Sequence, residues 1–462
     1  MAKLKKGTKM RIHKPIFFLP VESTPRELDY KINIAKHFCN MGFDIIIGNP
    51  PFIRDELQYK NYRGVFLEKG VNPDPEYYEN LKRKGILLYC LSDEGASYPA
   101  FSVTYQPAVD ALKMMELIFM WGEFQVKDLL ERCSDAELNK KYQVTGYPSF
   151  DLSLPKYKDY HKRFKPKELP NEYVLINTNF GSFNGSSIEE VLKACTHMSP
   201  ETFESLENSY KLEEKSFFKF YDWVVQLIKE FPKETFLIRP HPVEKIECYE
   251  KYFSDFKNVF ISQEGNANQA IASAKIVLHN DCTTALQSYL MGVPVVSLAY
   301  PSRDYIHATW ALDFGAQPES INEAKDIMAG LLKNKVFDVS VESAINEKAS
   351  LVLSKLFANV GCSTETLISM IKPKVNEFFS DLISYKVIDK RSLIQKIKLF
   401  IRRQLPLHYK VSSVSHKALT QFSEKDLRER LSALEKVDGI QLPCTIKKMF
   451  PNTFFISKDD AL

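Results

Sequence analysis

Residues 275–294 read KIVLHNDCTTALQSYLMGVP and contain a strand, a turn and a helix in direct succession. Lys275–Asn280 is a short apolar run of the kind that forms buried parallel strands. The helix begins near Thr283 and Thr284, and Gly292 with Pro294 marks its end. This succession predicts a doubly wound α/β unit with a parallel sheet.

The same alternation extends along the chain in both directions. Tyr147–Leu169, rich in Pro, Lys and Tyr, resembles a linker, and the pattern after Lys372 is helical and polar. We therefore expect domains at 1–165 and 166–371 and a C-terminal helical extension at 372–462. The expected strands are 14–20, 44–48, 85–91, 117–121, 143–146, 172–178, 235–240, 259–262, 275–280 and 293–298.

Composition excludes several classes of protein. The 462 residues are 44% hydrophobic and carry a net charge of +4, too little for a nucleic-acid binder of this size. No apolar run is long enough to span a bilayer, and the N-terminus lacks a signal-peptide cleavage site, so we expect a cytoplasmic protein. The eight cysteines and nine histidines show no metal-ligand spacing, and we expect neither a metal nor a cofactor.

The motif Ile238-Arg239-Pro240-His241-Pro242, with Glu244 two residues on, follows a predicted strand. Its two prolines fix the backbone, so the strand stops abruptly and presents Arg239 and His241 at the carboxyl edge of the sheet. Such a pair suits an anionic ligand. A proline-rich turn with a surface histidine is the alternative.

Thr283 and Thr284 open a second turn of the same kind, about 40 residues later. Hydroxyl groups beside the unpaired N–H groups of a helix start can bind a phosphate, although either threonine alone could be an ordinary helix cap. Two such turns in one Rossmann-like domain favour a nucleotide-phosphate site formed by Arg239, His241, Glu244, Thr283 and Thr284.

These motifs resemble those of a known family. The sequence R-P-H-P, followed by a strand, a Thr-Thr pair, a helix and Gly292-Val293-Pro294, is similar to the GT-B glycosyltransferases that use CMP-sugars, in particular bacterial Kdo and sialic-acid transferases. The stretches 19–29, 121–122, 144–151 and 177–180 look like those of surface carbohydrate biosynthesis proteins.

The resemblance implies a fold and a function. The fold would be GT-B, with two Rossmann-like domains facing each other across a cleft. The enzyme would move an acidic sugar, Kdo or a related nonulosonic acid, from a CMP-sugar donor to a glycan or lipid-linked glycan of a bacterial lipopolysaccharide or capsule. His241 would contact the donor phosphate, and Thr283 with Thr284 would hold that phosphate or the ribose.

The N-terminal domain should then bind the acceptor and the transferred sugar. Glu22 and Arg26 follow the first strand, where no G-x-G-x-x-G occurs, and Arg26 or Arg239 could pair with a sugar carboxylate. Asp93 and Glu94, at the end of the strand 85–91, are the candidate acid–base or nucleophilic pair, with a polar turn as the alternative. Glu123, after Trp121-Gly122, is a further candidate.

Two departures from the family pattern keep other functions open. Gln287 stands where relatives often carry an acid, and Asn177–Ser182 contains no carboxylate where a nucleophile is expected in retaining Kdo transferases. The stereochemistry therefore stays open. The alternatives are a UDP- or CDP-linked sugar transferase or epimerase of the same fold, and a non-catalytic glycan-assembly protein with a degenerate site.

A basic amphipathic segment lies in the C-terminal extension. Between residues 386 and 403, Leu393, Ile394, Ile397, Phe400 and Ile401 form one stripe. The basic residues outside that stripe include Lys390, Arg391, Lys396, Lys398, Arg402 and Arg403. This pattern suits either a peripheral contact with the inner face of the cytoplasmic membrane or a helix packed on the domains with a solvated cationic face.

Overall fold

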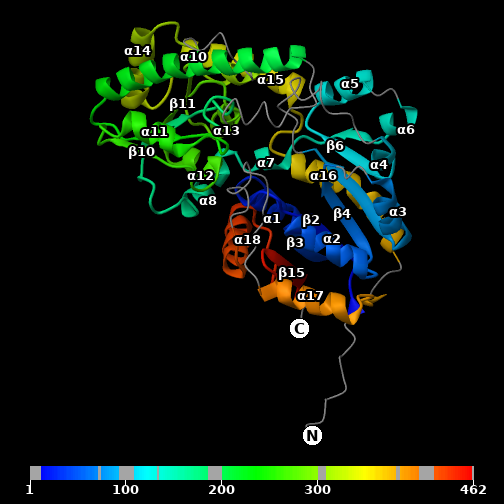
Figure 1. Ribbon diagram of the computed structural model, residues 1–462. Helices are drawn as coiled ribbons and strands as arrows, with labels where there is room; N and C mark the ends of the chain where they lie inside the picture. The colour runs from blue at the N-terminus through cyan, green and yellow to red at the C-terminus, as the bar shows by residue number, and fades with distance from the viewer. Residues whose placement is uncertain are drawn as a thin grey trace. The chain divides into compact units, whose positions relative to one another are not determined.

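The computed structural model describes residues 12–70, 74–92, 109–132, 135–185, 200–299, 309–380, 385–404 and 421–459. The chain divides into two compact units. Unit 1 comprises 1–95, 104–151 and 357–462, and unit 2 comprises 96–103 and 152–356. Each contains a sheet with helices on both faces, as Figure 1 shows.

The sheet of unit 1 has the strand order β14-β15-β3-β2-β4-β5-β6-β7. Strands β3 to β7 in this order are parallel, and β15 pairs antiparallel with β3 and β14. Strands β3 and β4 follow each other in the chain but pair with opposite edges of β2, so the strand order reverses at β2. The strands are β2 (Ile16–Pro20), β3 (Asp44–Gly48), β4 (Gly64–Lys69), β5 (Ile86–Leu91), β6 (Leu117–Met120), β7 (Tyr142–Val144), β14 (Cys444–Phe450) and β15 (Thr453–Lys458).

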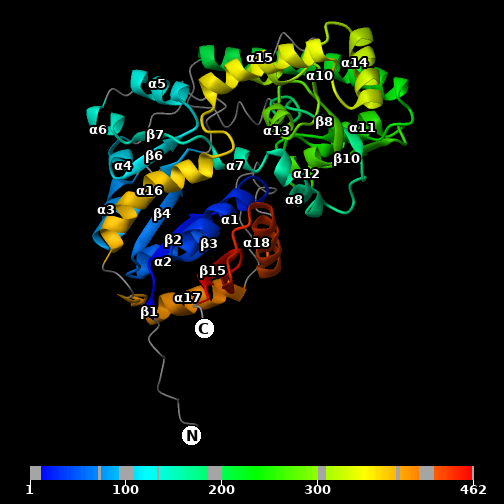
Figure 2. The same cartoon turned by 180° about the vertical axis from the view of Figure 1, so that it is seen from behind.

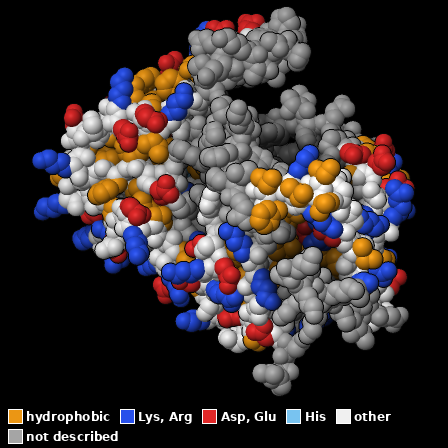
Figure 3. Space-filling view, turned by 60° about the horizontal axis from the view of Figure 1, so that its bottom comes forward, with side chains coloured by type: hydrophobic (Ala, Val, Ile, Leu, Met, Phe, Trp, Pro, Cys, Tyr) orange, Lys and Arg blue, Asp and Glu red, His pale blue; other side chains and the backbone are white. Residues whose placement is uncertain are grey.

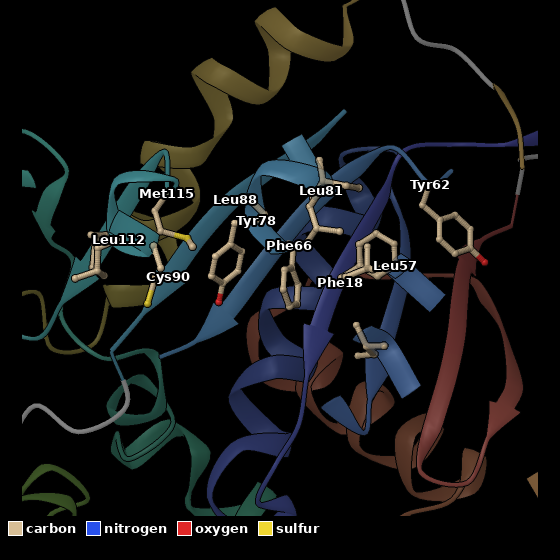
Figure 4. Close-up of a cluster of buried hydrophobic side chains, with 14 of the residues drawn as sticks. Phe18, Leu57, Tyr62, Phe66, Tyr78, Leu81, Leu88, Cys90, Leu112 and Met115 are labelled. Carbon is tan, nitrogen blue, oxygen red and sulfur yellow. The ribbon is translucent and has the colours of Figure 1, made fainter. Parts of the chain in front are cut away.

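Helices cover both faces of this sheet because its strands are apolar on both sides. Phe18 joins the cluster drawn in Figure 4, whereas Phe17 points to the other face and stacks on Phe38 with ring centroids 3.8 Å apart. On that second face α1 packs against both α16 and α18 (Figure 2). The helices are α1 (Thr24–Asn40), α2 (Pro50–Tyr59), α3 (Pro75–Arg83), α4 (Val109–Lys113), α5 (Glu123–Arg132), α6 (Ala136–Asn139), α7 (Pro148–Asp151), α16 (Ser363–Phe379), α17 (Leu393–Gln404) and α18 (Glu424–Asp438).

Unit 2 has a five-stranded parallel sheet in the order β10-β9-β8-β11-β12. From β8 the chain adds β9 and β10 on one side and then β11 and β12 on the other. The order therefore reverses between β8 and β11, as in a Rossmann half. The strands are β8 (Tyr173–Asn177), β9 (Phe236–Arg239), β10 (Val259–Ile261), β11 (Ala274–His279) and β12 (Val295–Ser297).

The core of unit 2 also has two sides. Ile176, Ile238 and Leu278 pack under the helices α10, α11 and α14, and Leu175 with Leu237 lies in the second cluster beside α12. The helices are η2 (Pro155–Tyr157), α8 (Lys158–Arg163), α10 (Pro200–Glu230), α11 (Ile246–Phe253), α12 (Ala267–Ala272), α13 (Thr284–Leu290), η4 (Thr309–Phe314), α14 (Ile321–Asn334) and α15 (Val339–Leu356).

The predicted α/β fold with two Rossmann-like units is confirmed, and all ten expected strands are found within two residues of their predicted bounds. The sequence pattern does not predict strand β4, because the end of this strand is charged. Glu68 is nevertheless buried there, and it accepts hydrogen bonds from Arg54 at 3.1 Å and from Tyr78 at 3.3 Å.

The C-terminal part differs from the all-helical extension that was expected. It contains the hairpin β14–β15 and the short strand β13 (Tyr385–Lys386), which pairs with β1 (Ile12–His13). It belongs to unit 1 from Phe357 onward, and the units change at 151/152 and 356/357 instead of 165/166 and 371/372. One anchor is Asp151, whose carboxylate accepts hydrogen bonds from the N–H groups of Ser363 and Thr364 at the start of α16.

Candidate functional site

The carboxyl edge of the sheet in unit 2 brings together three of the turns discussed above. Asn177, the last residue of β8, is in register with Arg239 of β9 on one side and with His279 of β11 on the other. The turns that follow these three residues therefore start in one row. They flank the place where the strand order reverses, which is where open α/β sheets bind their ligands.

Hydrogen bonds link the turns after β8 and β11 directly. Asn177 Nδ2 donates to Thr284 Oγ1 at 2.8 Å, and Asn179 Nδ2 donates to Asp281 Oδ1 at 3.1 Å. Asn280 Nδ2 donates to the same Asp281 oxygen at 2.9 Å. Asp281 is buried, so its carboxylate depends on these amides to replace the water it has lost.

Two amide oxygens at this place have no partner within the described part of the chain. They are Oδ1 of Asn177 and Oδ1 of Asn280, and both residues are 3% exposed. A buried acceptor left without a hydrogen bond costs roughly 1–3 kcal/mol, so native proteins rarely keep one unless a water or a ligand supplies the donor. Both oxygens lie beside the reversal in strand order and are ready to accept hydrogen bonds from hydroxyl or amino groups.

The two threonines begin α13 but do not cap it with their side chains. Thr283 occupies the N-cap position without a side-chain hydrogen bond and is exposed. Thr284 is partly buried and accepts the hydrogen bond from Asn177. The ordinary-cap alternative is thus not realised at Thr283.

His279 fixes the start of this turn from inside the core. Its Nδ1 accepts a hydrogen bond from Cys282 N at 3.2 Å, and its Nε2 lies 2.7 Å from Ser297 Oγ on β12. Burial lowers the pKa of His279 to about 3, so the ring is neutral at physiological pH. Because Nδ1 accepts, Nε2 carries the proton and donates to Ser297.

Glu244 supports the turn that carries His241. Its Oε1 accepts from His241 N at 2.9 Å and from Thr178 Oγ1 at 2.8 Å, and its other oxygen accepts from Tyr249 OH. Burial raises the pKa of Glu244, and these donors oppose that effect by stabilising the charged form. The structure places Glu244 beneath the turn, with all these contacts inside the protein.

Arg239 and Gln263 tie the loop after β10 to the same edge. The Arg239 guanidinium donates to the carbonyl oxygens of Glu264 at 2.8 Å and Gly265 at 2.9 Å, and it forms no ion pair with Glu244. Burial lowers the pKa of Arg239 to about 10. Gln263 Nε2 donates to the carbonyl oxygens of His241 and Glu244 at 2.8 and 2.9 Å. His241 itself is partly exposed.

In unit 1 the reversal in strand order lies at β2, and Glu22 with Arg26 follows that strand. Glu22 is exposed and pairs with Lys69 at the end of β4 at 2.8 Å. Lys69 also bonds the buried Glu27 at 2.7 Å, which in turn pairs with the buried Lys31 at 2.7 Å. Burial alone would raise the pKa of Glu27, but the two ammonium groups lower it to about 2.

The other candidate site residues of unit 1 form no common site within the described part of the chain. Asp93 and Glu94 lie outside them. Glu123 is exposed and begins α5, while Arg26 is exposed on the first turn of α1. The ends of β5 and β6 are joined by Trp121 Nε1, which donates to Ser92 O at 2.6 Å.

Two general findings bear on cofactors and membranes. No three His, Cys, Asp or Glu side chains within the described ranges come together as metal ligands. In that same part of the chain, none of the helices combines the length and the apolar character that a bilayer crossing requires.

The sequence interpretation uses the stretch 177–182 for its family resemblance and for the carboxylate it lacks, and it assigns none of these residues to the site. The structure shows that Asn177, Thr178 and Asn179 all make side-chain hydrogen bonds at the site. Their signal was three consecutive polar residues directly after an apolar strand, which is unusual unless the strand ends at a site.

The search of curated proteins found no match to this sequence. A family model described as Eco57I restriction-modification methylase matches residues 8–89. This segment covers a small part of the chain, and the carboxyl end of its strand β3 is covered by the β14–β15 hairpin. Asn49 N donates there to Asn452 O at 2.9 Å, Phe52 stacks on Phe450, and Asn49 is 2% exposed.

Several solved structures are similar to the chain over most of its length. UDP-GlcNAc 2-epimerase from Neisseria meningitidis bound to UDP-GlcNAc is 12% identical with a TM-score of 0.46, over 78% of this chain and 100% of that one. A putative UDP-N-acetylglucosamine 2-epimerase from Listeria monocytogenes is 10% identical with a TM-score of 0.44, over 80% and 98%. The wall teichoic acid polymerase TagF with CDPG is 12% identical with a TM-score of 0.42, over 79% and 89%. Because the identities are 10–12% and the TM-scores are below 0.5, we assign no substrate, reaction or residue role to this chain from these structures.

Proposed function

We propose that unit 2 binds a nucleotide-activated sugar at the carboxyl ends of β8 and β11, and that the protein is a glycosyltransferase of the GT-B type. The observation that carries this proposal is the pair of buried, unpartnered amide oxygens of Asn177 and Asn280 at the reversal in strand order. Nucleotide sugars are rich in hydroxyl groups, which can donate to such oxygens.

The other groups at this edge supply donors for a phosphate. In the proposed complex, the exposed hydroxyl of Thr283 and the ring of His241 bind the donor phosphate. Glu244 and Gln263 act indirectly, because they hold the His241 turn through its main chain. Arg239 holds the loop after β10 through two of its five donors, and its guanidinium contributes positive charge to the site.

Our proposal for the donor is a CMP-linked acidic sugar of the Kdo or nonulosonic-acid class, and for the acceptor a bacterial surface glycan. Its support is the family resemblance of the R-P-H-P and Thr-Thr motifs. Arg26 is the candidate for the sugar carboxylate, since a guanidinium can bind a carboxylate through two parallel hydrogen bonds. A donor linked to UDP or CDP, an epimerase of the same fold and a non-catalytic binding protein remain the alternatives.

Calorimetric titration of the full chain with CMP, CDP, UMP and UDP tests the donor. Tightest binding of CMP supports the proposal. A clear preference for a uridine nucleotide contradicts the CMP assignment and favours the UDP-linked alternative, whereas binding of none of the four contradicts the nucleotide site itself.

The catalytic carboxylate is a separate proposal. Glu94 is the first candidate, followed by Asp93 and Glu123. If Glu94 acts as base or nucleophile, Glu94→Gln lowers turnover about 100-fold or more, with CMP affinity and melting temperature nearly unchanged. Asp93→Asn and Glu123→Gln are the matched comparisons, and loss of turnover in only one of them would assign the role to that residue instead.

A further inference from the structure

Helix α17 exposes an apolar face. Five of its large hydrophobic side chains are between 51% and 74% exposed. Figure 3 turns the end of the molecule that carries α17 toward the viewer, and hydrophobic side chains gather there on the surface beside Lys and Arg side chains. The five residues, here called the α17 outer face, are Leu393, Ile394, Ile397, Phe400 and Ile401.

The outer face forms one stripe along the helix. At 3.6 residues per turn, its five residues fall within an arc of roughly 120°. Leu399 lies roughly opposite the middle of that arc. Among residues 393–401, whose burial the structure describes, it is the buried one, and it lies in a cluster with Phe52 and Phe450. The helix therefore packs on unit 1 with one side and presents its apolar stripe outward, the reverse of an ordinary surface helix.

A cluster of ion pairs around the buried Arg391 holds the chain on unit 1 just before the first residue of α17. Arg391, with its side chain 1% exposed, donates to Asp55 at 2.6 Å, to Glu56 at 2.8 Å and to Asp389 at 3.0 Å. Breaking such a cluster leaves uncompensated buried charge, so the segment is firmly held. These ion pairs therefore fix the orientation of α17, with its apolar stripe facing outward.

Positive charge borders the stripe on both sides. Lys396 and Lys398 are exposed and fall on opposite edges of the arc, and the sequence of α17 contains no acidic residue. Lysine side chains at the edges of an apolar stripe can keep their ammonium groups at the level of lipid head groups while the stripe enters the acyl region.

We propose that the α17 outer face docks on the surface of an anionic lipid bilayer. This inference rests on α17 alone and is independent of the nucleotide site. A second copy of the chain fits less well, because two such helices packed face to face would bring their lysines together without any carboxylate of α17 to pair with them. An anionic bilayer supplies both an apolar phase and the opposite charge.

Co-sedimentation of the full chain with vesicles tests the proposal. Vesicles of phosphatidylcholine mixed with phosphatidylglycerol should bind the protein, and pure phosphatidylcholine should bind it much more weakly. Ile397→Ser combined with Phe400→Ser should weaken binding roughly tenfold or more, since two large apolar groups no longer enter the bilayer. The matched control is Val339→Ser combined with Leu351→Ser on α15, where side chains 84% and 55% exposed are changed in the same way.

Charge is tested separately. Lys396→Gln combined with Lys398→Gln should lower binding to the anionic vesicles roughly tenfold or more and leave binding to the neutral ones unchanged. Equal binding of the wild type and the Ile397/Phe400 variant overturns the proposal, and so does absence of binding to anionic vesicles. A lipid-free dimer that the same variant dissociates would assign the face to contacts between copies, which also overturns it. An unchanged CMP affinity or an unchanged melting temperature in each variant shows that the fold is intact.

Discussion

Asn177 at the end of β8 donates a hydrogen bond to Thr284 at the start of α13 over 2.8 Å, across the point where the strand order of unit 2 reverses. The bond fixes the amide so that its oxygen stays buried without a partner in the described part of the chain. A single side chain thus orders the turn and leaves an acceptor for a ligand.

Asn177→Ala should weaken CMP binding about tenfold, because it removes both the acceptor and the bond that positions Thr284. Isothermal titration measures the change. The matched control is Asn258→Ala at the amino edge of the same sheet, where Asn258 donates to Glu234 O at 2.9 Å. Equal losses of affinity in both variants would show a general effect of an altered sheet and would remove Asn177 from the site.

His241→Ala and Glu244→Gln should distinguish a residue that contacts the nucleotide from one that stabilises the turn beneath it. His241→Ala should reduce CMP affinity by about tenfold and leave the melting temperature nearly unchanged, because the side chain is partly exposed. Glu244→Gln should lower both, since the buried carboxylate accepts from Thr178, Tyr249 and the His241 main chain. A Glu244→Gln protein with wild-type stability would contradict the supporting role.

His279 should make the fold less stable as the pH falls. Its pKa is about 3 when folded and about 6.5 when unfolded, so between these values only the unfolded chain takes up the proton. Stability is therefore complete above about pH 6.5 and is lost toward pH 3, at about 1.4 kcal/mol per pH unit from this group.

Urea unfolding of wild type and His279→Asn between pH 4 and 7 isolates this contribution. The difference between their unfolding free energies should shrink as the pH falls, because the variant lacks the titrating ring. A difference that does not change with pH would show that the His279 ring has the same pKa in the folded and unfolded chain, which contradicts the lowered pKa.

Glu27 should contribute stability that acid removes at lower pH. The ammonium groups of Lys31 and Lys69 hold its pKa at about 2, below the 4.5 of an ordinary glutamate. The contribution is complete above about pH 4.5 and disappears as the pH falls toward 2. Glu27→Gln should cost on the order of 3 kcal/mol at pH 7 and much less at pH 3, by chemical denaturation. An equal cost at both values would contradict the charge-based account.

The sequence predicts the local elements well and the long-range partners poorly. Apolar runs such as 44–48 predict strands correctly, because a strand that is buried on both faces of a sheet needs apolar side chains at consecutive positions. By contrast, β15 was missed although it pairs with β3, some 400 residues away in the chain. The residues that allow this pairing lie in two distant parts of the chain. Gly48, with φ +143°, leaves room for the backbone of Asn452 and Thr453, and a Cβ at position 48 would clash with that backbone.

The candidate site shows the same limit. The turns at His241 and Thr283 carry recognisable residue types, so their place at one sheet edge could be predicted. The links between Asn179 and Asp281, or between Gln263 and His241, depend on strand order, which local periodicity does not encode. Glu244 was assigned to the ligand from its neighbours in sequence, whereas its hydrogen bonds are to Thr178, Tyr249 and the main chain of His241.

Hydrogen–deuterium exchange of the full chain with and without CMP tests the central claim most directly. The account predicts slower exchange at 177–184, 239–244 and 280–286 when CMP is present, and no change around Asn258 at the opposite edge of the same sheet. Protection confined to unit 1, or no protection at these three turns at saturating CMP, would contradict a nucleotide site at the carboxyl ends of β8 and β11.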